Sequence, residues 1–290
     1  MSATGDGVER DIGAADDAHA ARLEARFLVR EQQQKRRAKL TRIGLNVLGV
    51  LLALGIWEAI PHLLPSLNVA LMPPPSVVFE AAWPMLLSGE ILNNIRISVL
   101  RAASGFVLAA ILGVCAGVLT ARVRIFNFLS EPLLHAARSI PAIALVPVSV
   151  LWFGIGEGAK LALICWGAFF PIWVSTFIGV RDVHQVYLRS AACLGAGRAH
   201  ALFLVMLPAA LPMILTGLRQ SIAISLIVLV AAELSGATAG VAYMMSMGHQ
   251  LFRVEIMFIG LLLLGLLGFL ADRGFVYIAR KLFPWYETFR

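Results

Sequence analysis

Charged residues are scarce in this sequence of 290 residues: Asp, Glu, Lys and Arg together make up 14%, whereas hydrophobic residues make up 59%. A soluble domain has too little interior to bury so much apolar side chain. The composition therefore excludes a soluble enzyme, a disordered chain and a disulfide-rich scaffold. Several apolar runs of about 17 to 20 residues can each cross a ~30 Å hydrocarbon core as a helix. The sequence predicts an all-α integral membrane protein.

Cysteine is also rare. Cys115, Cys165 and Cys193 lie far apart, so neither a C-x-x-C metal motif nor a disulfide framework is available, and we interpret them as small buried hydrophobes. The first 25 residues lack the charged and apolar regions of a cleaved signal peptide. We therefore expect the N-terminus to stay in the cytosol.

Motifs for catalysis and for nucleotide binding are absent as well. Residues 154–160 resemble a phosphate-binding loop only superficially, because Ala159 stands where the second glycine belongs. There is no H-E-x-x-H pair, no carboxylate pair at helical spacing inside a span, and no serine with a histidine base. The sequence predicts a non-catalytic chain that binds no metal, no ATP and no other cofactor. In a membrane protein an excess of Lys and Arg marks the cytoplasmic segments, so it does not indicate a nucleic-acid partner here.

Charge divides the chain into a tail and a membrane domain. Residues 1–42 begin acidic and end basic, which predicts a cytoplasmic tail, partly disordered and then helical. Residues 43–290 are predicted to form a domain of six transmembrane helices with both chain ends in the cytoplasm. The expected spans are 43–60, 99–121, 137–155, 161–180, 213–234 and 256–278.

Some segments of this topology depend on proline and on isolated charges. We expect an external helix that Ser76 caps and that runs toward Pro84. Arg96 and Arg101 lie near the outer end of the second span, and the simplest explanation for both is that they snorkel to the headgroups. Residues 199–218 are long enough for a span of their own, so a helical hairpin is an alternative there. Because Pro208 and Pro212 each remove an amide donor, we favour a cytoplasmic helix to about 205, a proline turn and then the fifth span.

The segment 181–219 carries the most specific pattern, reading RDVHQVYLRSAACLGAGRAHALFLVMLPAALPMILTGLR. It resembles the coupling loop of ABC-importer permeases, in which an E-A-A-type motif, a glycine and a later L-P form a short helix-turn-helix that sits on the ATP-binding subunit. The loop covers about 181–212. The residues at the matching positions, or directly beside them, are Arg189, Ser190, Ala191, Ala192, Leu194, Gly195, Ala196 and Pro208.

The resemblance extends over about 70–285 and favours the branch that imports sulfonates, taurine, nitrate and similar compounds. It rests on P-P-P-S at 73–76, S-V-L-R-A-A-S-G-F at 98–106, R-S-I-P-A-I-A-L-V-P at 138–147 and L-W-F-G-I-G-E at 151–157. The chain departs from the family at Arg189, where an acidic residue is usual, and at Ala192, where an arginine is common. We hypothesise that the partner carries the swapped charge opposite Arg189.

This resemblance implies a type I ABC-importer permease fold with a cytoplasmic coupling helix, in the bacterial inner membrane. The implied partners are a second permease copy, two cytoplasmic ATP-binding subunits that hold ATP and Mg, and an external substrate-binding protein. Binding of ATP would close the dimer of ATP-binding subunits, and the coupling loop would transmit this motion to the membrane helices, which would alternate between inward and outward access. The rival interpretations are a stand-alone secondary transporter or channel and a membrane scaffold without a transport function.

Ionisable groups within spans are costly and usually face a bundle interior or water. Arg138 and Arg219, expected at cytoplasmic span ends, could bind lipid phosphate, pair with Glu131 or line a vestibule for an anion. Glu233 could form part of a gate, dock a binding protein or pair with Arg101. Pro141 and Pro147 are expected to bend the third span and to free carbonyls toward a pathway. The candidate pathway residues are Arg138, Pro141, Pro147, Arg219 and Glu233.

Overall fold

A computed structural model describes residues 41–42, 44–61 and 71–284 of the chain. It divides into two compact units, Met1–Val69 and Ala70–Arg290. In the first unit the described part is mainly an apolar helix over Gly44–Pro61, long enough to cross a membrane. The predicted acidic and basic parts of the tail lie outside the described residues.

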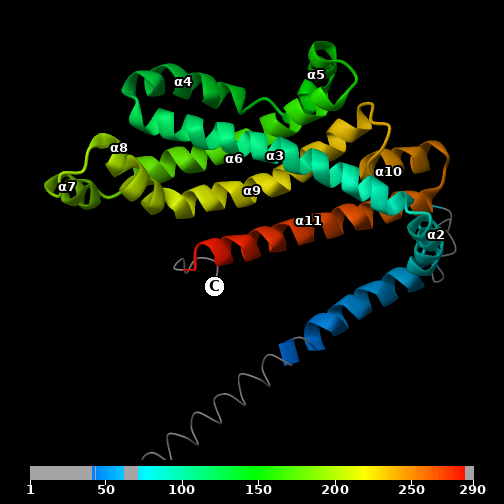
Figure 1. Cartoon of the computed structure of the whole chain (residues 1–290). Helices are drawn as coiled ribbons and strands as arrows, with labels where there is room; N and C mark the ends of the chain where they lie inside the picture. The colour runs from blue at the N-terminus through cyan, green and yellow to red at the C-terminus, as the bar shows by residue number, and fades with distance from the viewer. Residues whose placement is uncertain (1–40, 43, 62–70, 285–290) are drawn as a thin grey trace, which may run out of the picture. The chain divides into compact units, whose positions relative to one another are not determined.

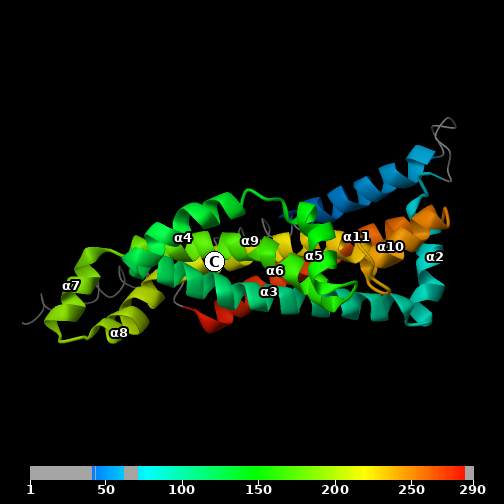
Figure 2. The same cartoon turned by 90° about the horizontal axis from the view of Figure 1, so that it is seen from above.

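The second unit is helical throughout its described part, and Figure 1 shows long helices that run side by side. Short helices lie at opposite ends, with α7 and α8 at one end and α2 and α10 at the other, in both views (Figures 1 and 2). We refer to these as the α7 end and the α10 end. In chain order the elements are α2 (Pro75–Leu87), α3 (Glu90–Arg122), α4 (Arg124–Ala137), η1 (Ala142–Leu145), α5 (Val146–Phe153), α6 (Glu157–Arg181), α7 (Gln185–Cys193), α8 (Arg198–His200), η2 (Ala201–Met206), α9 (Leu207–Leu234), α10 (Val241–Gln250) and α11 (Val254–Leu282).

Five helices among the described residues are long and apolar enough to span a membrane, and a bent pair makes six if it counts as one span. That pair replaces the predicted third span. Its halves, Arg124–Ala137 and Ala142–Phe153, meet at 88° instead of forming the single bent helix expected over 137–155. The break falls before Pro141, which caps η1, while Pro147 lies in the first turn of α5, where a missing N–H costs nothing.

The core is a layer of three helices in which α6 packs against α3 on one side and α9 on the other. Glycines set the spacing, because a β-carbon on Gly113 or Gly117 would lie 2.9 Å or less from the side chains of Ile172 or Thr176. A β-carbon on Gly217 of α9 would lie 2.6 Å from the Cβ of Ser175 in α6. The G-x-x-x-G spacing at 113–117 therefore serves close packing between helices.

The proline turn predicted after residue 205 is wrong. The helix continues from Arg198 to Leu234, and its segment Ala201–Met206 is wound as a π-helix. A proline ring in an α-helix collides with the carbonyl four residues earlier. The wider π winding directly before Pro208 avoids this collision at Pro208. The helix also continues through Pro212, which lies within α9.

The helix predicted from Ser76 toward Pro84 also differs from its prediction. It begins at Pro75 with Pro74 as its N-cap, instead of being capped by Ser76, and it continues through Pro84 to Leu87. Proline fits the first turn because its fixed φ matches the helix and its absent N–H has no partner there.

Candidate functional site

The first candidate site is the α7 end, where α7 and the turn after it form the predicted coupling segment. The helix begins after His184, whose Nδ1 accepts a hydrogen bond from the Val186 N–H at 3.3 Å. It ends in a Schellman motif: the Ala196 N–H donates to the Ala191 carbonyl and the Gly195 N–H to the Ala192 carbonyl, both at 3.0 Å. The sequence indicated the glycine but not the histidine cap.

Gly195 adopts a φ of +79°, a conformation that costs a residue with a β-carbon about 1–2 kcal/mol. No atom within 4 Å blocks a side chain there, so the backbone conformation alone explains the glycine. The sharp turn at Gly195 leaves Leu194 at the tip of the segment, 89% exposed.

The two alanines of the motif face opposite ways. Ala191 is 7% exposed and belongs to the inner face of α7, whereas Ala192 is exposed. The small side chain of Ala191 therefore packs inside this chain, and Ala192 is the alanine that α7 exposes. The outer face instead presents Val186, Tyr187 and Leu194, all more than half exposed, together with the exposed Arg189.

The neighbouring motif residues follow the same division. Ser190 is exposed beside Arg189, and Ala196 is half-buried after the turn. Pro208 lies in the first turn of α9, beyond η2, and so stands apart from the α7 tip. An exposed apolar tip with a basic rim is a surface suited to a protein partner.

The second candidate site comprises the arginines within the bundle. Arg101 does not snorkel: its side chain is 6% exposed, and it joins Glu157 of α6 at 2.6 Å and Glu233 of α9 at 3.0 Å. The guanidinium also donates to the Ala239 carbonyl. Of the alternatives for Glu233, the structure shows the pair with Arg101. Sequence reasoning missed Glu157, which is the first residue of α6 and follows the glycines of the preceding turn.

Arg219 is also paired, and its partner is not Glu131. It donates from Nε and Nη2 to the two carboxylate oxygens of Asp272 in α11, at 2.6 and 2.9 Å. Both side chains are half-exposed. Sequence reasoning missed Asp272 because it lies 53 residues away, on a helix that periodicity alone does not place beside α9.

Arg138 lies in the break between α4 and η1 and lines a cavity of about 530 Å³ with residues of η1, α6 and α9. The side chains and backbone around it are Ile140, Pro141, Ala142, Ile143, Trp166, Gly167, Phe170, Pro171, Val174, Ser175, Gln220, Ile224, Ile227 and Val228. Pro141 thus accompanies Arg138, whereas Pro147, Arg219 and Glu233 do not line this cavity.

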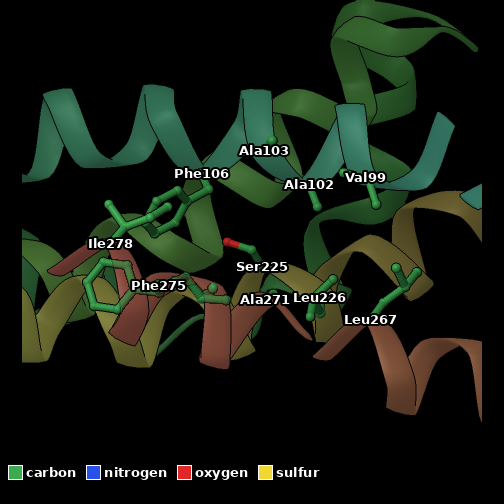
Figure 3. Close-up of a pocket in the computed structure, with 12 residues that line it drawn as sticks. Val99, Ala102, Ala103, Phe106, Ser225, Leu226, Leu267, Ala271, Phe275 and Ile278 are labelled. Atoms are coloured by element: carbon green, nitrogen blue, oxygen red, sulfur yellow. The ribbon is translucent and has the colours of Figure 1, made fainter. Parts of the chain in front are cut away.

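A third feature is the cavity of about 320 Å³ between α3, α9 and α11, shown in Figure 3. Its lining is apolar apart from Ser225, whose hydroxyl donates to the Ser221 carbonyl at 2.7 Å. Since it offers no charge and no free donor, it cannot select a solute by charge.

A bundle of helices long and apolar enough to span a membrane, with a cavity at a broken helix and an exposed helix-turn unit at one end, has the architecture of an integral membrane protein. The comparisons place it more closely. Residues 109–284 match the family described as binding-protein-dependent transport system inner membrane component, and the chain belongs to this family. It is a multi-pass inner-membrane permease of the sulfonate- and taurine-type branch of ABC importers.

Its relatives are named for related solutes. The chain is 35% identical to the aliphatic sulfonates transport permease SsuC of Bacillus subtilis, over 85% of this chain and 88% of that protein. It is 32% identical to the taurine transport system permease TauC of Escherichia coli, over 89% and 98%. It is 30% identical to the bicarbonate transport system permease CmpB of Synechococcus elongatus, over 85% and 92%.

The fold agrees with the family. The inward-facing MetNI methionine ABC transporter has a chain that superposes with a TM-score of 0.58 at 19% identity, covering 69% of this chain and 98% of that one. This likeness supports the predicted type I permease fold.

Proposed function

We propose that this permease couples ATP hydrolysis in partner subunits to the import of a small anionic solute by alternating access. The chain itself binds no ATP, Mg or other cofactor and carries out no chemistry. Two copies enclose the pathway, two cytoplasmic ATP-binding subunits dock at the α7 ends, and an external binding protein delivers the solute. Both chain ends lie in the cytoplasm. The solute is a sulfonate, taurine, nitrate, bicarbonate or a similar small anion.

The observation that carries the proposal is the exposed tip of α7. Val186, Tyr187 and Leu194 are exposed apolar residues of α7 and of the turn after it, Arg189 of the same helix is also exposed, and α7 lies at one end of the bundle (Figure 1). Exposed apolar side chains on one short element favour a surface for a protein partner. The Schellman turn at Gly195 fixes this surface, so a displacement imposed on it moves α7 as a unit.

Two carboxylates of the long helices also separate this proposal from its rival, a stand-alone secondary transporter or channel. Such a protein needs coupling carboxylates of its own within the bundle. Glu233 and Asp272, carboxylates of the long helices, are each held in an ion pair with an arginine. Their commitment to structural pairs supports an energy source outside the chain.

Co-purification tests the proposal. The complete chain, tagged at its C-terminus and extracted from its native host in mild detergent, is expected to retain an ATP-binding subunit in equal amount. Leu194→Glu should abolish this retention because it places a charge on the apolar tip. Gln250→Glu, the same charge on exposed α10 at the other end, is the matched control and should retain the subunit. An intact homo-oligomer without an ATPase, alongside a control importer that keeps its own, contradicts the proposal.

A further inference from the structure

Arg101, Arg138 and Arg219 differ in whether a carboxylate holds the guanidinium. Arg101 and Arg219 lie at contacts between helices, and Arg138 lies at the break between α4 and η1. Arg101 and Arg219 are each held by carboxylates at 2.6 Å. The guanidinium of Arg138 forms no ion pair and no hydrogen bond with any residue that the structure describes. An arginine side chain has five N–H donors and keeps its positive charge. The donors of Arg138 are therefore available to a ligand.

Arg138 is not at a span end, as the sequence suggested, but beside the middle of the long helices. The part of α6 that lines its cavity, Trp166 to Ser175, lies near the centre of Glu157–Arg181. The lining part of α9, Gln220 to Val228, lies in the central region of that helix. An unpaired charge at this depth is costly unless it faces a water-filled space or binds an ion.

The cavity has the size and the chemistry for a small anion with an organic group. Its volume of about 530 Å³ falls within the ~300–1,000 Å³ typical of small-molecule sites. Arg138 is its single charge, Ser175 and Gln220 add a hydroxyl and an amide, and Trp166 and Phe170 supply apolar surface. Its lining includes the break between α4 and η1, and broken helices commonly form transporter binding sites.

From this juxtaposition we infer that Arg138 is the recognition residue for the oxyanion of the solute, a sulfonate or carboxylate. The planar guanidinium donates two parallel N–H groups to two oxygens of one such group. Gln220 and Ser175 line the same space and can donate to a remaining oxygen, while the aromatic rings contact the organic part. The inference rests on the proposed import function and assigns the place where the pathway selects for charge.

The test measures binding directly on the complete chain, with the subunits it retains, in nanodiscs of phosphatidylcholine. Thermal stability is followed while ethanesulfonate is added, with neutral dimethyl sulfone and matched sodium chloride as controls. Wild type is expected to be stabilised saturably by ethanesulfonate alone, because a ligand of the folded state raises its stability. Arg138→Gln should weaken the apparent affinity at least tenfold, or about 1.4 kcal/mol. Arg138→Lys should lose less.

Arg96→Gln is the matched control, since Arg96 is an exposed arginine of α3 without a partner among the described residues and outside the cavity. It should bind ethanesulfonate as wild type does. Equal stabilisation of wild type and Arg138→Gln overturns the inference, and so does the absence of any stabilisation of wild type. Stabilisation that arises only in phosphatidylglycerol nanodiscs, and is lost in Arg138→Gln, identifies a lipid site and also overturns it.

These results are independent of co-purification. Arg138→Gln should retain the ATP-binding subunit as wild type does, because Arg138 lies beside the middle of α6 and α9 whereas α7 lies at one end of the bundle. If no ATP-binding subunit is retained by wild type, the import proposal fails, whatever the ethanesulfonate titration shows.

Discussion

Arg101 of α3 and Glu233 of α9 form an ion pair of 3.0 Å in which the carboxylate is completely buried. The same carboxylate accepts hydrogen bonds from the Ser98 hydroxyl at 2.7 Å and from the Ala242 N–H at 2.9 Å. One side chain therefore joins α3, α9 and the first turn of α10. Because these contacts hold three helices together, we expect Glu233 to contribute to stability at the α10 end.

Glu233→Ala is expected to destabilise the protein by ~3 kcal/mol, the lower end of the cost of breaking a buried ion pair, because Glu157 still pairs with Arg101. Thermal unfolding in detergent measures this change. Glu255→Ala, which removes the carboxylate of the more exposed pair with Arg253, should change stability by less than ~0.5 kcal/mol. Equal destabilisation by Glu233→Ala and Glu255→Ala would contradict a stabilising role for the buried Arg101–Glu233 pair beyond that of a surface pair.

Gly240→Ala should destabilise the same end by about 1–3 kcal/mol or more. The backbone φ is +129°, and a β-carbon would overlap the Glu233 carboxylate. Gly274→Ala in α11 is the matched control, because it has an ordinary helical conformation and no atom within 4 Å of the new β-carbon. It should be neutral or stabilising by up to ~1 kcal/mol. The unfolding temperatures of the two variants are compared in one detergent. An unfolding temperature of Gly240→Ala as high as that of Gly274→Ala would contradict the prediction.

Gly195→Ala should reduce ATP-driven uptake while leaving membrane insertion intact. The substitution strains the Schellman turn at φ +79° by about 1–2 kcal/mol and so disturbs the α7 tip. Gly197→Ala, two residues on, has a negative φ and open space around it, and it should transport as wild type does. Uptake into vesicles, with the amount of inserted permease measured in parallel, distinguishes the two. Normal uptake by Gly195→Ala would remove the turn from the coupling mechanism.

The Arg219–Asp272 pair is expected to be structural, so exchanging its charges should rescue it. Asp272→Arg alone places two like charges together and should lower the amount of folded protein. The double variant Arg219→Asp with Asp272→Arg should recover most of it, because the bidentate contact between α9 and α11 can re-form. Uptake should recover in parallel with folding. Recovery of folding without uptake would instead assign Arg219 to the solute pathway.

Much of the fold follows from hydropathy, charge and glycine. Apolar runs bounded by arginines predict the long helices, and the structure places Gly113 and Gly117, four residues apart, at a close helix contact. The errors concern proline. Pro208 terminates helices by its local chemistry, but the π winding of the preceding segment removes the steric conflict, and only the three-dimensional path of the chain shows this.

The sites were predicted unevenly for a similar reason. The α7 turn is a local feature, so Gly195 could be identified from its neighbours. The fates of Arg101, Arg138 and Arg219 depend on helices that are distant in sequence, and no pattern in the chain tells which arginine meets a carboxylate and which does not. Asp272 carried no sequence signal beyond being an acid inside an apolar run.

The glycine contacts that seat α6 against α3 and α9 have a mechanical consequence. Where a glycine lets the side chain of a neighbouring helix reach its backbone, the two helices cannot slide past one another without collision, and a close-packed interior transmits strain instead of absorbing it. We therefore expect α3, α6 and α9 to move together as one rigid body. A displacement of α7 would then be passed along these helices to the end that holds the Arg101–Glu233 network.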